Sequence, residues 1–118
     1  MPTKRAIGSQ YESEAIHYLE SLGFDLVIKN YYTPLGEIDL VFLKEAKLYF
    51  VEVKYRSSDA YGSPRDAITQ KKLNHMKQSA IYYIKRECSI YTPYAISFMG
   101  IKRVGDDLQF DFLENIFS

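Results

Sequence analysis

Cysteine is almost absent from this chain, and long apolar runs are absent altogether. Cys88 is the single cysteine, which excludes an internal disulfide framework and a cysteine-based zinc site and favours a reducing, cytoplasmic setting. No run approaches the roughly 18 consecutive apolar residues that a membrane span needs, so we expect no membrane insertion. No apolar segment follows the basic N-terminus, so we expect no secretory signal either.

The chain also lacks net charge, because 15 acidic residues balance 15 basic ones. A neutral protein of this kind is not expected to coat DNA indiscriminately. The charges are unevenly spread: eight acids and three bases lie between residues 9 and 53, whereas two acids and eight bases lie between residues 54 and 86. An acidic region that can hold cations beside a basic region that can hold phosphates suits metal-dependent work on nucleic acid. The alternative is that some bases, such as Lys77 and Lys85, form the wet face of a helix.

The 118 residues, of which 47% are hydrophobic, predict one globular domain over residues 1–118. Apolar spacing predicts a first helix from Ser9 to Gly23 and a second over residues 65–87. Strands are expected at residues 24–32, 37–43, 48–55, 94–101 and 108–112. The predicted fold class is α/β, a mixed sheet flanked by helices in the order α-β-β-β-α-β-β.

Two of these strands carry ionisable residues inside apolar runs: GEIDLV at residues 36–41 and FVEVK at residues 50–54. Residues two apart in a strand share a face, so Glu37 and Asp39 are expected to point one way and Ile38 and Leu40 the other. By the same spacing, Glu52 shares a face with residue 54, a lysine. Burying such charges costs several kcal/mol per ion unless they are paired or bind a metal, an order-of-magnitude figure.

The short link between the two strands predicts an antiparallel hairpin. If Glu45 and Ala46 form its tip, Asp39 lies opposite Glu52 and Glu37 lies opposite Lys54. Side-chain parity favours this register or one two residues away, because a slip of one residue would put the carboxylates on opposite faces. Two carboxylates facing each other across a ladder repel, whereas Mg²⁺, for which Mn²⁺ can substitute, binds one or two carboxylates plus waters. We therefore expect a magnesium site here. The alternative, a charged edge hairpin with cross-strand ion pairs, fits less well beside the apolar run of residues 48–53.

Glu12 has two interpretations, which are not exclusive. It lies one turn before Ala15 and Ile16 on the apolar stripe of the first helix, which would aim a third carboxylate at Asp39 and Glu52. The pattern Ser9-x-x-Glu12 is also that of a capping box, in which the glutamate bonds back to the Ser9 amide.

The motifs together resemble those of the uncharacterised YraN-like family, which belongs to the restriction-endonuclease-like superfamily. The resemblance rests on G-E-I-D-L, on F-V-E-V-K-Y-R, and on an N-terminal G-x-x-x-E-x-x-A-x-x-Y-L that begins at Gly8. It covers nearly the whole chain, through Tyr61, Gly62 and Lys72, and implies a restriction-endonuclease-like core. Archaeal-type Holliday junction resolvases are similar in length and motif order.

The resemblance implies that four residues occupy the superfamily's active positions: Glu12, Asp39, Glu52 and Lys54. The chain departs from the family at two positions. Tyr11 stands where the family usually has glycine, and Ala95 stands where it usually has aspartate, which leaves any role of that aspartate unsupported here.

The expected activity is metal-dependent endonucleolytic hydrolysis of phosphodiester bonds in branched or damaged DNA. Asp39 and Glu52 would hold Mg²⁺ with the Val53 carbonyl and with Glu12, directly or through water. Lys54 would orient or deprotonate the attacking water and stabilise transition-state charge, and Glu37 would support it by pairing.

Nucleic-acid contacts are expected chiefly from Lys72, and also from Lys71, Arg56 and Tyr31. His17 and His75 have no partner at a metal-ligand spacing and are expected to be structural. A homodimer is left open. The alternative function is a non-catalytic domain that binds nucleic acid or protein on the same fold.

Overall fold

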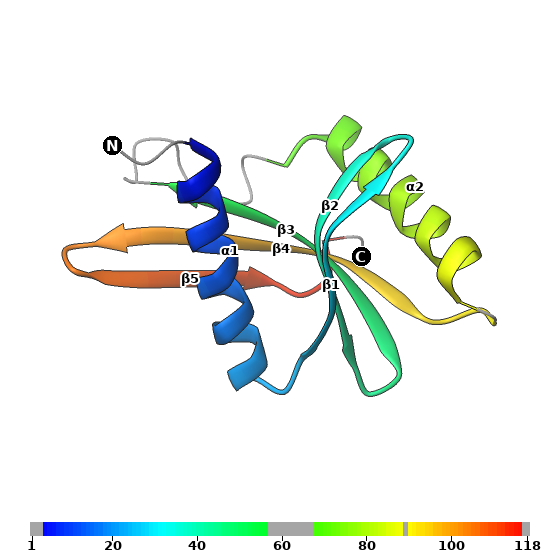
Figure 1. Ribbon diagram of the computed structural model, residues 1–118, viewed down its shortest axis with the longest axis horizontal. Coiled ribbons are helices and arrows are strands. Elements are labelled where there is room, and N and C mark those ends of the chain that lie inside the picture. Colours follow the sequence, from blue (N-terminus) through cyan, green and yellow to red (C-terminus); the bar gives the residue numbers. More distant parts are fainter. Residues whose placement is uncertain (1–3, 57–67, 89, 117–118) are drawn as a thin grey trace.

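A computed structural model of the chain describes residues 4–56, 68–88 and 90–116 (Figure 1). The predicted element order is confirmed. The elements are α1 (Lys4–Ser21), β1 (Asp25–Thr33), β2 (Gly36–Lys44), β3 (Lys47–Arg56), α2 (Gln70–Glu87), β4 (Tyr94–Val104) and β5 (Asp107–Leu113). Within these ranges, no helix combines the length and the apolar character that crossing a bilayer requires.

The five strands form one mixed sheet in the order β1-β2-β3-β4-β5. Only the β3–β4 pair is parallel, because α2 connects these two strands, whereas the other neighbours are antiparallel. Each face of the sheet carries one helix and one apolar cluster. Leu19 of α1 packs with Leu40 and Val51, and Ile84 of α2 packs with Val41 and Phe50. Consecutive strand residues thus enter opposite clusters, as the pleat requires.

Both helices begin at positions that differ from the prediction. Helix α1 begins at Lys4, so Ser9 and Glu12 lie inside it, and of the two interpretations of Glu12 the capping box is wrong. Helix α2 begins at Gln70, after Thr69, whose extended backbone and side-chain oxygen cap the first turn. The predicted start at residue 65 lies outside the described residues, but Ile68 and Thr69 are not helical.

The β2–β3 hairpin has the predicted register over its first half. The pairs run from Lys44 with Lys47 to Leu40 with Val51. Glu45 and Ala46 form the tip with φ values of +51° and +62°, the positive values of a type I′ turn. Beyond the Leu40–Val51 pair, β2 continues beside β1 and β3 continues beside β4. Figure 1 shows the two strands parting there, β2 toward α2 and β3 toward the N-terminal half of α1.

The side-chain alternation along β2 breaks where the strands part. Leu40 belongs to the cluster beneath α1, whereas Ile38, two residues away, belongs to the cluster beneath α2. The prediction that Ile38 and Leu40 share a face is therefore wrong. The break coincides with Asn30 on the neighbouring strand, whose φ of +56° is left-handed. A residue in this conformation reverses the pleat locally, and asparagine tolerates it better than most residues.

Candidate active site

A pocket of about 190 Å³ opens where β2 and β3 part, with α2 as its other wall. It brings together side chains from β2, β3 and α2. The carboxylates in its lining are Glu37, Asp39 and Glu52, and its basic residues are Lys72 and His75. Two strand carboxylates that the sequence predicted to be neighbours thus share one cavity.

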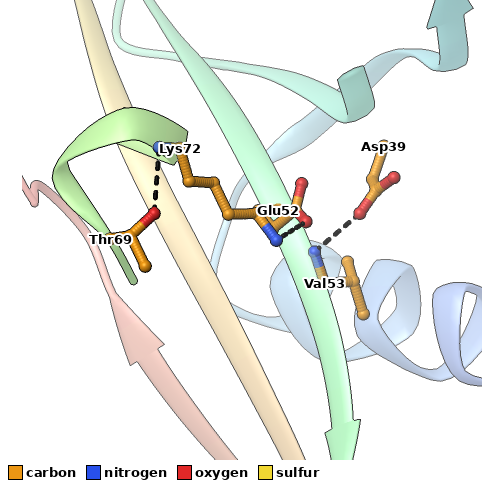
Figure 2. Close-up of polar contacts among 5 residues, drawn as sticks. All are labelled: Asp39, Glu52, Val53, Thr69 and Lys72. Atoms are coloured by element: carbon orange, nitrogen blue, oxygen red, sulfur yellow. Dashed lines mark hydrogen bonds and ion pairs between the residues drawn. The ribbon is translucent and has the colours of Figure 1, made fainter. Parts of the chain in front are cut away.

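Asp39 lies at the fork itself. Its Oδ2 accepts a hydrogen bond of 2.9 Å from the Val53 amide, so the side chain of β2 replaces a ladder contact to β3 (Figure 2). Burial, followed by the charge of Glu52, raises the pKa of Asp39 to about 7. The Val53 hydrogen bond opposes this rise by favouring the anion. The Asp39 carboxylate is therefore held in place but is unfavourable as an anion.

Glu52 is paired across the pocket with Lys72. The Lys72 Nζ lies 2.6 Å from the Glu52 Oε1, and Figure 2 shows the lysine reaching from the first turn of α2 to β3. The backbone of this turn is fixed by Thr69, whose Oγ1 accepts a hydrogen bond of 3.1 Å from the Lys72 amide. The flexible lysine side chain is thus attached to a capped, ordered helix end.

Glu12 approaches from α1 and is joined to Glu37 by Asn30. With its amide nitrogen facing the two acids, Asn30 donates to Glu37 Oε1 at 2.7 Å and to Glu12 Oε2 at 3.2 Å. Burial, followed by the charge of Glu37, raises the pKa of Glu12. The charges of Glu12 and Glu37 also raise the pKa of Asp39. The contact of Glu12 is therefore with Asn30, which also binds Glu37, whereas the prediction aimed Glu12 at Asp39 and Glu52.

Three further predicted residues, all of them described, lie outside the pocket lining. Lys54 is exposed, two residues beyond Glu52 on β3, and Lys71 is exposed on α2. Tyr31 packs edge-on against Tyr83 of α2 and donates a hydrogen bond of 2.8 Å to Glu87. Arg56 ends β3, and its side chain is not among those described.

The two departures from the family pattern are both packing positions in this fold. Tyr11 is buried, and its ring stacks on Tyr55 with centroids 3.7 Å apart. Ala95 is buried on β4 in the cluster beneath α1. Neither residue lines the pocket between β2, β3 and α2.

The donor set fits a magnesium site of two carboxylates. Among the described residues, no group of three or more carboxylate, imidazole or thiolate side chains is arranged to hold a metal ion. Mg²⁺ does not need such a group, because it retains several waters and binds through one or two carboxylates. Asp39 and Glu52 can supply these two, and the Asn30 contact of Glu12 suits a role through water better than direct ligation.

Two residues of this region were missed by sequence reasoning. Asn30 belongs to no motif. It stands out only because asparagine favours turns and here lies inside a predicted strand. His75 lines the pocket one turn after Lys72, so the spacing of the two residues on a helix could have placed it there. It was expected to be merely structural.

The fold and the site define a small α/β protein with a helix on each face of its sheet and a carboxylate-lined pocket between two parting strands. The chain belongs to the uncharacterised protein family UPF0102, whose model matches residues 11–113. The predicted YraN-like membership is thus confirmed. The matched range includes every residue predicted to be catalytic or to bind metal.

Similar proteins occur in distant bacteria. The chain is 34% identical over 117 residues to a UPF0102 protein of Vibrio parahaemolyticus, which covers 98% of this chain and 95% of the relative. It is 32% identical over 112 residues to one of Fusobacterium nucleatum, covering 95% and 91%. A third, from Syntrophomonas wolfei, is 41% identical over 81 residues, covering 69% of this chain and 70% of the relative.

Proposed function

We propose that this protein is a metal-dependent endonuclease that hydrolyses phosphodiester bonds in DNA, with branched or damaged DNA as its substrate. The observation that carries the proposal is the meeting of Asp39 and Glu52 in one pocket at the fork. Burial and the neighbouring charge disfavour the Asp39 anion. A divalent cation would relieve both effects, so an otherwise costly arrangement becomes favourable when the cation binds.

In this proposal Asp39 and Glu52 would hold Mg²⁺ or Mn²⁺, assisted by the Val53 carbonyl and, through water, by Glu12. The cation would activate water for attack and offset negative charge on the phosphate. Asn30 fixes the orientation of Glu12, as the Val53 amide fixes that of Asp39. Lys54 orients or deprotonates the attacking water and stabilises the additional negative charge of the transition state.

The basic residues at the start of α2 and the end of β3 are proposed to bind the DNA backbone. Lys72 is the foremost of them because it lines the pocket itself. Lys71 precedes it on α2, and Arg56 is the last residue of β3. Tyr31 remains a proposed contact, although its hydroxyl is engaged by Glu87. Glu37 is proposed to support the site through Asn30 rather than through Lys54, because its carboxylate accepts a hydrogen bond from the asparagine.

The test is cleavage of branched, flapped, duplex and single-stranded DNA in Mg²⁺, in Mn²⁺ and in EDTA. Cleavage of at least one substrate should require the cation, and Asp39→Asn should remove it while leaving the fold intact by circular dichroism. A matched variant, Asp111→Asn at an exposed position of β5, should cleave as the wild type does. Cleavage that persists in EDTA or in Asp39→Asn would contradict the proposal.

A second function has one observation in its favour. Lys72 neutralises Glu52 directly, so this carboxylate has a counter-charge without any metal. A domain that binds nucleic acid or protein without catalysis could retain such a pair for structure alone. DNA binding that is indifferent to divalent cations, together with no cleavage of any substrate, would favour this second function.

A further inference from the structure

We propose that Lys72 is an internal counter-ion of the metal site, which a divalent cation displaces from Glu52 and which then binds the DNA backbone. Metal and DNA would therefore bind cooperatively through this one side chain. The inference rests on the proposed function, because it requires a cation at Asp39 and Glu52.

The contact between the two residues is the starting point. Lys72 Nζ lies 2.6 Å from Glu52 Oε1, and the two side chains are 33% and 18% exposed. An ion pair with partly desolvated partners is screened less than a surface pair, so Lys72 is held against Glu52 rather than extended into solvent. As long as this pair persists, the Glu52 carboxylate offsets the charge of Lys72 and weakens its attraction for an incoming phosphate.

A cation bound to Glu52 would change which conformation of the Lys72 side chain has the lowest free energy. An ammonium group beside a divalent ion is repelled by it, and the Glu52 oxygen that it contacts is needed as a ligand. The Lys72 backbone cannot follow because Thr69 caps that turn of α2, but the four-carbon side chain can swing. The freed ammonium stays at the rim of the same pocket, where a phosphate bound near the cation would lie.

Displacement of this kind has a reciprocal consequence. A cation that frees Lys72 strengthens DNA binding, and by thermodynamic linkage DNA that captures Lys72 strengthens cation binding by the same factor. A lysine that only adds to the positive surface would instead strengthen DNA binding equally with and without the cation. The two roles therefore differ in a quantity that binding measurements give directly.

The experiment compares wild-type protein with Lys72→Ala and Lys85→Ala. Lys85 is an exposed lysine in the last turn of the same helix, roughly 20 Å along its axis, so its loss is a matched change of one charge. Mn²⁺ affinity is measured by calorimetry without DNA. Affinity for a fluorescent branched DNA is measured by anisotropy in EDTA and in Ca²⁺, after a gel has verified that no cleavage occurs in Ca²⁺.

Lys72→Ala is expected to bind Mn²⁺ about fivefold or more tightly than the wild type, because the competing ammonium is gone. Its loss of DNA affinity should be about fivefold or more greater in Ca²⁺ than in EDTA. Lys72→Arg, which can also pair with Glu52 and with phosphate, should restore the Ca²⁺ dependence. Lys85→Ala should bind Mn²⁺ as the wild type does and should weaken DNA binding equally in both conditions.

Two results overturn the inference, and they are distinguishable. If every variant binds Mn²⁺ equally and Lys72→Ala loses the same DNA affinity in both conditions, the coupling is absent while the metal site stands. If the wild type and Lys72→Ala both bind no Mn²⁺, the proposed function fails and the inference fails with it.

Discussion

The two halves of the β2–β3 hairpin are built from the same strands but differ in strand pairing and in the polarity of their surroundings. The closed half, residues 40–51, is a continuous antiparallel ladder that ends in a two-residue turn. The forked half, residues 36–39 and 52–56, begins at the next position, where the two strands stop pairing with each other and each pairs only with its outer neighbour. Apolar side chains fill both faces of the closed half, whereas the forked half opens on a pocket that three acids, a lysine and a histidine line together with apolar residues.

The difference shows how a small sheet can combine stability with an open polar site. In the closed half, alternate side chains enter the two apolar clusters, and each contributes to the free energy of unfolding. In the forked half, the Val53 amide would lack a partner on β2 if the Asp39 carboxylate did not accept its hydrogen bond. That hydrogen bond keeps a buried acid at the fork. The free-energy cost of burying this acid is offset by the apolar burial in the closed half.

The largest effect is expected from Phe42, which is fully buried in the closed half and packs edge-on against Phe24. Phe42→Ala should lower the free energy of unfolding by about 3–5 kcal/mol, the usual cost of removing a buried ring. Urea denaturation in EDTA measures it. Phe42→Leu, which retains most of the apolar volume, should cost less and keeps the test possible if the alanine variant does not fold. A cost below about 1 kcal/mol would mean that the closed half is not what stabilises the sheet.

The next effect concerns catalysis in the forked half, at Lys54. Lys54→Ala should lower the single-turnover rate of DNA cleavage by about 100-fold or more, because the lysine acts on the water or on the transition-state charge. DNA affinity should change little, since one charge among many contributes modestly to backbone binding. Both quantities are measured on the same substrate. A loss of affinity that accounts for the whole loss of rate would make Lys54 a binding residue.

A smaller effect is expected from Asp39 on the way in which the stability of the fold depends on pH. The pKa of this group is about 7 in the folded protein, against an ordinary value of 3.8. The folded state therefore holds the proton more tightly than the unfolded chain does. The stability from this group is complete below about pH 4 and is lost as the pH rises toward 7.

Asp39→Asn cannot ionise, and its side-chain oxygen can still accept the Val53 hydrogen bond. At pH 8 in EDTA the variant should be more stable than the wild type by about 1 kcal/mol or more, roughly 3–6 °C in Tm for a domain of this size. The advantage should shrink toward pH 4. Thermal unfolding of both proteins from pH 4.5 to pH 8 measures it, and parallel curves would place the Asp39 pKa near its ordinary value.

The closed half was predictable from the sequence, and the fork was predictable only in part. Strand alternation and a short link narrow the register to this one or to one two residues away, because a slip of one residue would expose the apolar face. The structure has the register with Glu45 and Ala46 at the tip. The pairing of Lys72 with Glu52 was not predictable, since it depends on where α2 crosses the sheet. The predicted phosphate contact at Lys72 did, however, identify a residue that lines the pocket.

Two local errors have physical causes. The broken alternation at Asp39 coincides with the left-handed backbone of Asn30 on the neighbouring strand, and a backbone angle of this kind cannot be read from an apolar pattern. The early start of α1 was obscured because the Ser9 and Glu12 spacing matches a capping box, although a helix interior can contain the same two residues.

The smallest effect is expected at the tip of the closed half, where Ala46 has a φ of +62°. A left-handed backbone is unfavourable for alanine and free of this cost for glycine, whose greater unfolded-state entropy takes back part of the gain. Ala46→Gly should therefore raise the free energy of unfolding by about 0.5–1 kcal/mol. Gly105 has the same φ of +62° in the β4–β5 turn, so Gly105→Ala should lower it by a similar amount.

Urea denaturation of both turn variants measures these changes, and Mn²⁺ affinity provides the comparison with the fork. Because the tip lies at the far end of the ladder from Asp39, Ala46→Gly should stabilise the protein and leave Mn²⁺ binding as it is in the wild type. A change in Mn²⁺ affinity would mean that the ladder transmits the geometry of its turn to the pocket. The two halves of the hairpin would then be one cooperative unit rather than a stable support and an independent site.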